Sequence, residues 1–333
     1  MNIRKLGTTD MAISAVGFGS WAVGGGDWAF GWGHQDDDAS VRSILRAAAT
    51  EVNWIDTAPV YGLGHSEEVV GLALAQLPVR DRPMVFTKCG VIWDPANRYA
   101  ETRNLAAPES IRRECEASLE RLGVERIDLY QIHWPDESGV PVEDSWGEMS
   151  RLHDEGKVRA IGVSNFDVAL LERCESVRHV ESLQPPLSLI RRESAATLLP
   201  WCAAHRTGVI VYSPMASGLL TDSFSATRVA AMAETDWRHN KADLNEPALT
   251  PNLALRDTLR PIAARHGTTV SAVAVAWTLA WPGVTGAIVG ARRPDQVDGW
   301  IGAGSLVLDA ADLAEIAVAI ERTNAGSGPA MPE

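Results

Sequence analysis

Short apolar runs recur along the chain, and most are followed by a stretch with the apolar spacing of an amphipathic helix. The runs are AVGFG (15–19), NWID (53–56), MVFTK (84–88), IDLYQIH (127–133), RAIGVS (159–164), ESLQ (181–184), GVIVYS (208–213) and GAIVG (286–290). Near-continuous hydrophobicity is typical of strands buried on both faces, and strands that alternate with helices form parallel sheets. The pattern therefore predicts a parallel α/β fold.

Eight strand–helix units in roughly 300 residues favour a (β/α)8 TIM barrel, with an open doubly wound sheet as the alternative. Helix signals support the assignment, because Pro108 stands in a first turn and Gly123 and Gly156 follow helix ends, as does Gly208. The first residues, NIRKLGTTDMAISAVGFG, predict a β-hairpin that leads into the first barrel strand. We expect residues 1–321 to form one domain and residues 322–333 a disordered tail.

Two segments depart from the simple alternation. Residues 223–251 are too long for an ordinary connection and are expected to form a lid or a binding loop. Residues 267–291 carry no charge and are long enough to cross a bilayer, but WPGVTG interrupts them. We interpret this stretch as a buried helix, a turn and a buried strand, and predict no membrane segment.

Composition narrows the class of protein. Of the 333 residues, 46% are hydrophobic and 22% charged, which argues against disorder, and the net charge of −13 argues against nucleic acid or an anionic membrane as partner. The four cysteines show no CxxC pair and no metal-like spacing, so no metal site is predicted. Together with a start that does not resemble a signal peptide, this indicates a cytoplasmic protein. The oligomeric state stays open, a homo-oligomer included.

A dinucleotide-binding fingerprint appears near the N-terminus and is interpreted as false. Gly17, Gly19 and Ala22 in GFGSWA satisfy GxGxxA, and acids follow at residues 36–38. A Rossmann site needs a helix to open at these glycines so that its N-terminus can bind pyrophosphate. The residues that follow, VGGGDWAFGWGHQDDD, cannot form a stable helix. We expect a glycine-rich loop instead, with Asp36–Asp38 as the N-terminal acids of the first helix.

Four polar side chains follow three neighbouring strands at the points where the strands end. Asp56 ends NWID, Tyr61 lies in the loop after it, Lys88 ends MVFTK, and His133 ends IDLYQIH. Each alone has a plainer explanation: a turn cap, a solvated lysine or a hydrogen-bonded core histidine. In a (β/α)8 barrel, however, these strand ends open into one cavity, where the active site lies.

This set of side chains is suited to proton transfer to an oxygen. A free phenol has a pKa near 10, and a neighbouring ammonium is expected to lower it. The carboxylate would keep that ammonium charged, and the imidazole can orient a carbonyl or relay a proton. None of these groups supplies a hydride, so reduction would need a redox cofactor.

With these motifs the sequence resembles the aldo-keto reductases, especially the bacterial branch related to potassium-channel β subunits, from about Ile3 to Glu321. DTAPVYG, TKCG and QIHWPD match the family's catalytic tetrad at Asp56, Tyr61, Lys88 and His133. The resemblance implies that Tyr61 is the general acid, that Lys88 and Asp56 tune it, and that His133 orients the substrate carbonyl.

The resemblance also implies a nicotinamide cofactor, NADPH/NADP+ in preference to NADH. Ser164, Asn165 and Gln184 would hold the carboxamide, and Tyr212 would stack on the nicotinamide. The other implied cofactor contacts are Trp21, Ser213, Met215, Gly218, Leu220, Gly290, Ala291, Arg292 and Gln296. Arg292 would meet the 2′-phosphate. Relatives often carry Glu-Asn where this chain has Gly299 and Trp300, which leaves the adenine contact open.

The sequence leaves the substrate undetermined. The tryptophans expected to line its pocket, besides Trp21, are Trp28, Trp32, Trp93 and Trp134. They would favour aromatic or other apolar carbonyls, but tryptophans also pack against sugars. The leading prediction is NADPH-dependent reduction of aldehydes or ketones to alcohols. The alternatives are an NADP-dependent sugar or polyol dehydrogenase and a channel-β-like regulatory subunit that binds cofactor.

Cys89, although next to Lys88, is predicted to be a packing residue because neighbouring strand positions face opposite sides.

Overall fold

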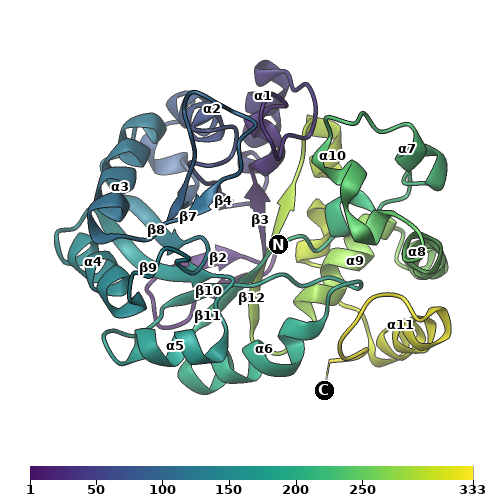
Figure 1. Ribbon diagram of the computed structural model, residues 1–333. Helices are drawn as coiled ribbons and strands as arrows, with labels where there is room; N and C mark the ends of the chain where they lie inside the picture. Colours follow the sequence, from purple (N-terminus) through teal and green to yellow (C-terminus); the bar gives the residue numbers. More distant parts are fainter. Residues whose placement is uncertain (333) are drawn as a thin grey trace.

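Eight parallel strands close into a barrel with helices around its outside, in a computed structural model that describes residues 1–332 (Figure 1). The order around the barrel is β10-β11-β12-β3-β4-β5-β8-β9. The strands are β3 (Val16–Gly19), β4 (Trp54–Asp56), β5 (Met84–Cys89), β8 (Ile127–Ile132), β9 (Val158–Ser164), β10 (Ser182–Gln184), β11 (Gly208–Val211) and β12 (Val284–Gly290). Every predicted strand is present, and the (β/α)8 barrel is confirmed.

The helices follow the strands along the chain, as the predicted alternation requires. They are α1 (Asp37–Ala48), α2 (His65–Ala75), α3 (Pro108–Leu122), α4 (Val142–Asp154), α5 (Val168–Glu175), α6 (Glu193–His205), α8 (Leu249–Arg265), α9 (Val270–Leu279), α10 (Pro294–Asp298) and α11 (Ala310–Thr323). The Asp36 carboxylate caps α1 by accepting a hydrogen bond from Ala39 N. After β3, which contains Gly17 and Gly19, the chain forms only a short 3₁₀ helix, Trp21–Gly24. The Rossmann interpretation is therefore excluded, as predicted.

The inside of the barrel is filled by large side chains that alternate along the strands. Trp54 and Phe86 stack with ring centroids 5.1 Å apart, and Gly17 has no room for a side chain because a Cβ there would lie 2.2 Å from the Trp54 indole. The predicted N-terminal hairpin, β1 (Ile3–Lys5) with β2 (Ala12–Ser14), pairs in antiparallel register. Its Leu6, Met11 and Ile13 join the same apolar cluster. The hairpin thus closes the N-terminal end of the barrel and leaves the opposite end for a site.

The segment from residue 267 to 291 folds as α9, a turn and β12, as predicted. All ten residues of α9 are buried by protein, which explains why the helix carries no charge. Within residues 1–332, no helix is both long and apolar enough to span a bilayer.

The structure differs from the sequence prediction at the C-terminal tail. Residues 322–333 were expected to be disordered. Residue 333 lies outside the described residues, but α11 continues to Thr323 and residues 325–327 lie against the start of α6. Ser327 N donates to Ile190 O at 3.0 Å, and Arg192 N donates to Ser327 O at 2.9 Å. The Arg192 guanidinium also donates to Ala325 O. Because these contacts involve mainly backbone groups, the amino-acid composition of the tail does not predict them.

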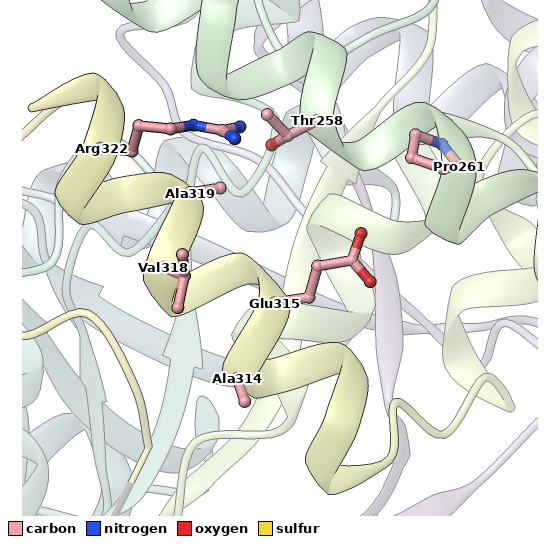
Figure 2. A pocket seen from close by; sticks show the side chains of 7 residues that line it. All are labelled: Thr258, Pro261, Ala314, Glu315, Val318, Ala319 and Arg322. Carbon is pink, nitrogen blue, oxygen red and sulfur yellow. The ribbon is translucent and has the colours of Figure 1, made fainter.

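A surface groove of about 420 Å³ lies between α8 and α11, on the outer helix layer (Figure 2). It is lined by Thr258, Pro261, Ala314, Glu315, Val318, Ala319 and Arg322. None of these residues belongs to the predicted site, which lies at the C-terminal end of the barrel strands.

Candidate active site

The four residues expected at the strand ends meet at the C-terminal mouth of the barrel. Lys88 Nζ donates to Asp56 Oδ1 at 2.6 Å, to Thr57 O at 2.9 Å and to Tyr61 Oη at 3.3 Å. The His133 ring meets the Tyr61 ring edge-on, with centroids 5.7 Å apart. The lysine is therefore held between the carboxylate and the phenol, with the imidazole beside the phenol.

Burial dominates the electrostatics of this cluster. The sequence led us to expect a lowered pKa for Tyr61, but burial raises the pKa of this phenol and outweighs the opposing effect of the Lys88 ammonium. For Lys88, burial lowers the pKa, yet Asp56 and Tyr61 more than offset it and the pKa is raised. Burial, and then the charge of Lys88, place the pKa of His133 well below its ordinary value. At neutral pH the cluster thus holds a protonated phenol, an ammonium and a neutral imidazole.

Two buried glutamines complete the surroundings of Asp56, and sequence reasoning missed one of them. Gln184 Nε2 donates to Asp56 Oδ2 at 2.8 Å and to Gln131 Oε1 at 3.2 Å. Gln131 Nε2 lies 3.4 Å from the same Asp56 oxygen. Gln131 was hidden because it stands inside the apolar run IDLYQIH, two residues before the more conspicuous His133.

Ser164, Asn165 and Tyr212 lie together next to this cluster. Asn165 Nδ2 donates to His133 O at 3.0 Å and to Ser164 Oγ at 3.1 Å, and Tyr212 Oη donates to Asn165 Oδ1 at 2.8 Å. Asn165 also has a positive φ of 61°. The three predicted carboxamide and ring contacts are therefore assembled in one place, from β9, β11 and the loops that follow them.

Trp21 stands over Tyr61 as part of an aromatic stack. Its ring lies 6.0 Å from that of Tyr61 at an interplanar angle of 21°, and 4.6 Å from that of Trp237 at 27°. Trp32 packs edge-on against Trp21 and Trp237. Trp237 comes from the long segment 223–251, which also contains α7 (Ala226–Ala230). The backbone N of Trp237 donates to Gly31 O. The predicted lid thus covers the mouth of the barrel.

The other three tryptophans predicted for the substrate pocket occupy different positions. Trp28 is buried against Ala58, Val60 and Val91, and Trp93 packs on the same cluster. Trp134 is 42% exposed. Trp28 and Trp93 therefore belong to the cluster on which Tyr61 and Trp21 also pack. Of the four tryptophans, Trp32 alone belongs to the stack over Tyr61.

The loop after β11 has a backbone that non-glycine residues seldom adopt. Ser213, Ala216 and Ser217 have φ values of 57°, 47° and 59°, followed by Gly218 at 96°. Such strain is of order 1–3 kcal/mol per residue and clusters at ligand-binding sites. Lys241 Nζ donates to Ser217 Oγ at 2.9 Å, and the Arg238 guanidinium lies 3.4 Å from Ser217 O. Each of the two cations also pairs with a carboxylate of its own segment, Arg238 with Asp236 at 2.6 Å and Lys241 with Asp243 at 3.5 Å.

At the far side of the mouth, Arg292 is engaged with the tryptophan-containing loop. Its guanidinium donates to Gln35 Oε1 at 2.7 Å, to Trp32 O at 3.1 Å and to His34 O. Gln296 Oε1 accepts from Arg292 N at 2.7 Å and from Arg293 N at 3.3 Å, so this amide caps α10. Trp300, whose role the sequence left open, is 2% exposed and packs in the core.

The comparison with known proteins decides the family. Residues 15–321 match the model of the aldo/keto reductase family. The chain belongs to this family. It is 33% identical to aldo-keto reductase YhdN of Bacillus subtilis (strain 168), over all of this chain and 97% of the relative. It is 35% identical to the NADH-specific methylglyoxal reductase of Escherichia coli (strain K12), over 95% of this chain and 98% of the relative.

A solved aldo/keto reductase structure shares the architecture. The glycerol dehydrogenase of Gluconobacter oxydans superimposes with a TM-score of 0.88 at 36% identity, covering 98% of this chain and 97% of that one. The family uses nicotinamide cofactors. Sequence reasoning missed four residues at the mouth of this reductase fold: Gln131, Trp237, Arg238 and Lys241. The length of segment 223–251 was the only signal for the last three.

Proposed function

We propose that the protein reduces small aldehydes or ketones to alcohols with NADPH, with Tyr61 as the general acid. The observation that carries the proposal is the position of Lys88 Nζ, 2.6 Å from Asp56 Oδ1 and 3.3 Å from Tyr61 Oη. A phenol next to a fixed ammonium can give its proton to a carbonyl oxygen that is becoming negative, because the ammonium stabilises the phenolate that remains.

Each side chain of the cluster has a distinct part. Asp56 keeps Lys88 charged and oriented, and Lys88 stabilises the Tyr61 phenolate after proton transfer. His133, whose lowered pKa keeps it neutral, can donate one N–H to the carbonyl oxygen and hold it beside Tyr61. The stack of Trp21, Trp32 and Trp237 over Tyr61 limits access of water and of large substrates.

The residues present fit a nicotinamide dinucleotide. When bound, the cofactor supplies the hydride. Ser164, Asn165, Gln184 and Tyr212 would hold the nicotinamide end, with Trp21 nearby. The strained loop Ser213–Gly218, which includes Met215 and precedes Leu220, would face the pyrophosphate together with Lys241. Residues at the end of β12 and the start of α10 would meet the adenosine: Gly290, Ala291, Arg292 and Gln296.

The preference for NADPH over NADH is part of the proposal and rests on Arg292. A guanidinium can pair with the 2′-phosphate through two hydrogen bonds. In this structure Arg292 donates to Gln35 and to carbonyls of the loop, so binding the phosphate would require it to exchange these partners. One relative at 35% identity carries the name of an NADH-specific enzyme, which makes a direct comparison of both cofactors the first experiment.

Small, polar three-carbon compounds are the substrates we favour. The relatives named for methylglyoxal and for glycerol both act, by their names, on such compounds, and the tryptophan stack leaves Tyr61 covered. The second candidate, a polyol dehydrogenase, is favoured by the 36% identity to a glycerol dehydrogenase, since the same residues serve both directions.

Steady-state rates separate these candidates. Methylglyoxal and a longer aromatic aldehyde are offered with NADPH or NADH, and glycerol with NADP+ or NAD+. We expect the highest kcat/KM with NADPH and the small aldehyde. Faster oxidation of glycerol at neutral pH would favour the dehydrogenase. Cofactor binding without turnover of any substrate would favour a regulatory subunit.

A further inference from the structure

One layer of the barrel interior is polar, although the layer below it is apolar. Trp54, Phe86 and Leu129 belong to the apolar cluster inside the barrel. Residues two further along a strand face the same side, and these are Asp56, Lys88 and Gln131. Gln184, from β10, reaches into the same layer. Buried polar layers are stable only when their groups are paired, and a fully paired network fixes the orientation of its members.

Gln131 lies at the centre of this layer. Strand pairing sets it beside Lys88 on one side and Gly162 on the other. A Cβ at Gly162 would lie 3.3 Å from Gln131 Cγ and 2.7 Å from Ser182 O. The glycine therefore leaves the space in which the glutamine side chain extends toward Asp56 and Gln184.

Contacts with Asp56 and with Gln131 together determine which way the Gln184 amide points. Gln184 Nε2 donates to Asp56 Oδ2 at 2.8 Å and to Gln131 Oε1 at 3.2 Å. Both N–H groups of the Gln184 amide are thus used inside the protein. Its Oε1 has no hydrogen-bond partner within residues 1–332 and remains as the acceptor that Gln184 can offer to a ligand.

We propose that Gln131 is a positioning residue that holds Gln184 with its oxygen toward the cofactor site, and that it couples this site to Asp56 and Lys88. The inference rests on the proposed function. An acceptor at this place recognises the N–H donor of a carboxamide and discriminates against a group that lacks one. Without Gln131, the Gln184 amide keeps only its hydrogen bond to Asp56 Oδ2, so one contact in place of two fixes its orientation.

The test compares two ligands that differ only in this donor. Dissociation constants of NADP+ and its 3-acetylpyridine analogue, which has no carboxamide N–H, are measured by protein fluorescence. If the wild type binds NAD+ more tightly, the corresponding NAD+ pair is used. A neutral hydrogen bond corresponds to roughly a 2- to 12-fold difference in affinity, so we expect the wild type to favour the carboxamide several-fold. In Gln131→Met, which conserves volume, we expect a smaller ratio than in the wild type, because only the contact with Asp56 then orients the Gln184 amide.

Two further variants serve as controls for Gln131→Met. Burial and the neighbouring Asp56 carboxylate keep a glutamic acid protonated at this place. Gln131→Glu then retains an oxygen that accepts from Gln184 Nε2 and an O–H that can donate to Asp56, so it should retain the wild-type ratio. Ser182→Ala is the matched control, because this buried serine lies on the strand of Gln184 and its Oγ has no hydrogen-bond partner within the described residues. It should also leave the ratio unchanged. A wild-type ratio in Gln131→Met, an equal loss in Ser182→Ala, or loss of the ratio in Gln131→Glu would overturn the proposal.

Turnover gives an independent readout. Gln131→Met also removes the amide donor 3.4 Å from Asp56 Oδ2, and loss of one such hydrogen bond corresponds to roughly a 2- to 12-fold effect, so kcat of Gln131→Met should fall several-fold. Should Gln131→Met not fold, Gln131→Leu takes its place in the same comparison of binding ratios. The ratio is an equilibrium quantity and does not depend on catalysis. It therefore tests Gln131 even if Tyr61 proves not to be the acid, whereas failure to bind any nicotinamide cofactor would remove the proposed function itself.

Discussion

Lys88 and Asp56 form an ion pair inside the barrel, with Nζ and Oδ1 2.6 Å apart and the two side chains 0% and 3% exposed. A buried pair of this kind adds little to stability compared with apolar residues, but losing one partner leaves a charge uncompensated. We therefore expect Asp56→Asn to lower the free energy of unfolding by about 3–5 kcal/mol, measured by urea denaturation. Glu143→Gln breaks the surface pair with Arg173 and should change stability little. Equal effects of the two substitutions would contradict the interpretation.

Replacing Tyr61 with Phe tests the general acid. The ring is kept and the donor is removed, so the fold and cofactor affinity should survive. We expect kcat for reduction to fall about 10²- to 10⁴-fold, with some activity left because His133 or water can donate. Tyr99→Phe is the control, since Tyr99 is 61% exposed. Near-normal turnover of Tyr61→Phe with a chemistry-limited substrate would exclude the proposed mechanism.

Glu114 should make folding stability depend on pH. Burial is the main reason that the pKa of this carboxyl is raised from 4.5 to about 7, against hydrogen bonds from Gly90 N and Ser110. Between these two values the native protein binds more protons than the unfolded chain, so stability should fall as pH rises from 4.5 to 7. The shift corresponds to at most about 3 kcal/mol. Glu114→Gln should flatten this part of the stability–pH curve in urea denaturation, and an unchanged slope would show that other groups cause it.

Arg292→Ala tests whether the Arg292 guanidinium binds the 2′-phosphate of the cofactor or only holds the neighbouring loop. If Arg292 meets the 2′-phosphate, the dissociation constant of NADPH should rise at least about tenfold, as expected for loss of a charge-assisted hydrogen bond, while that of NADH changes less. If Arg292 serves only to hold the loop at Trp32 and Gln35, both constants should rise together. Arg293→Ala is the control because Arg293 is exposed and its side chain pairs with Asp295. Fluorescence titration measures the dissociation constants of NADPH and NADH for the wild type and for both variants.

Cys89→Ser should retain most of the activity. The thiol is buried and lies 3.8 Å from Met149 Sδ on α4, which places it on the outer face of β5, opposite Lys88. Burial raises its pKa well above the ordinary value, so little reactive thiolate is present at neutral pH. Loss of most activity without loss of folded protein would show that Cys89 takes part in the reaction.

The sequence alone determined the barrel and its strand ends. Strand–helix alternation is a local property, because each apolar run and each helix cap is encoded within a few residues. Once eight parallel strands are expected, their ends must open at one face, so Asp56, Lys88 and His133 could be brought together without coordinates. The same logic did not isolate Gln131, since one polar residue inside an apolar run is the usual appearance of a strand that fills a barrel.

Only the tertiary structure decided how the mouth of the barrel is covered and which partners the site residues contact. Trp237 stacks on Trp21, and Arg292 reaches Gln35, across more than 200 residues of sequence. Such contacts depend on closure of the whole barrel and on irregular loops, where no periodicity constrains which side chain faces which. For the same reason the sequence predicted that Lys88 would lower the pKa of Tyr61, whereas the complete burial of the phenol, a property of the folded mouth, raises it.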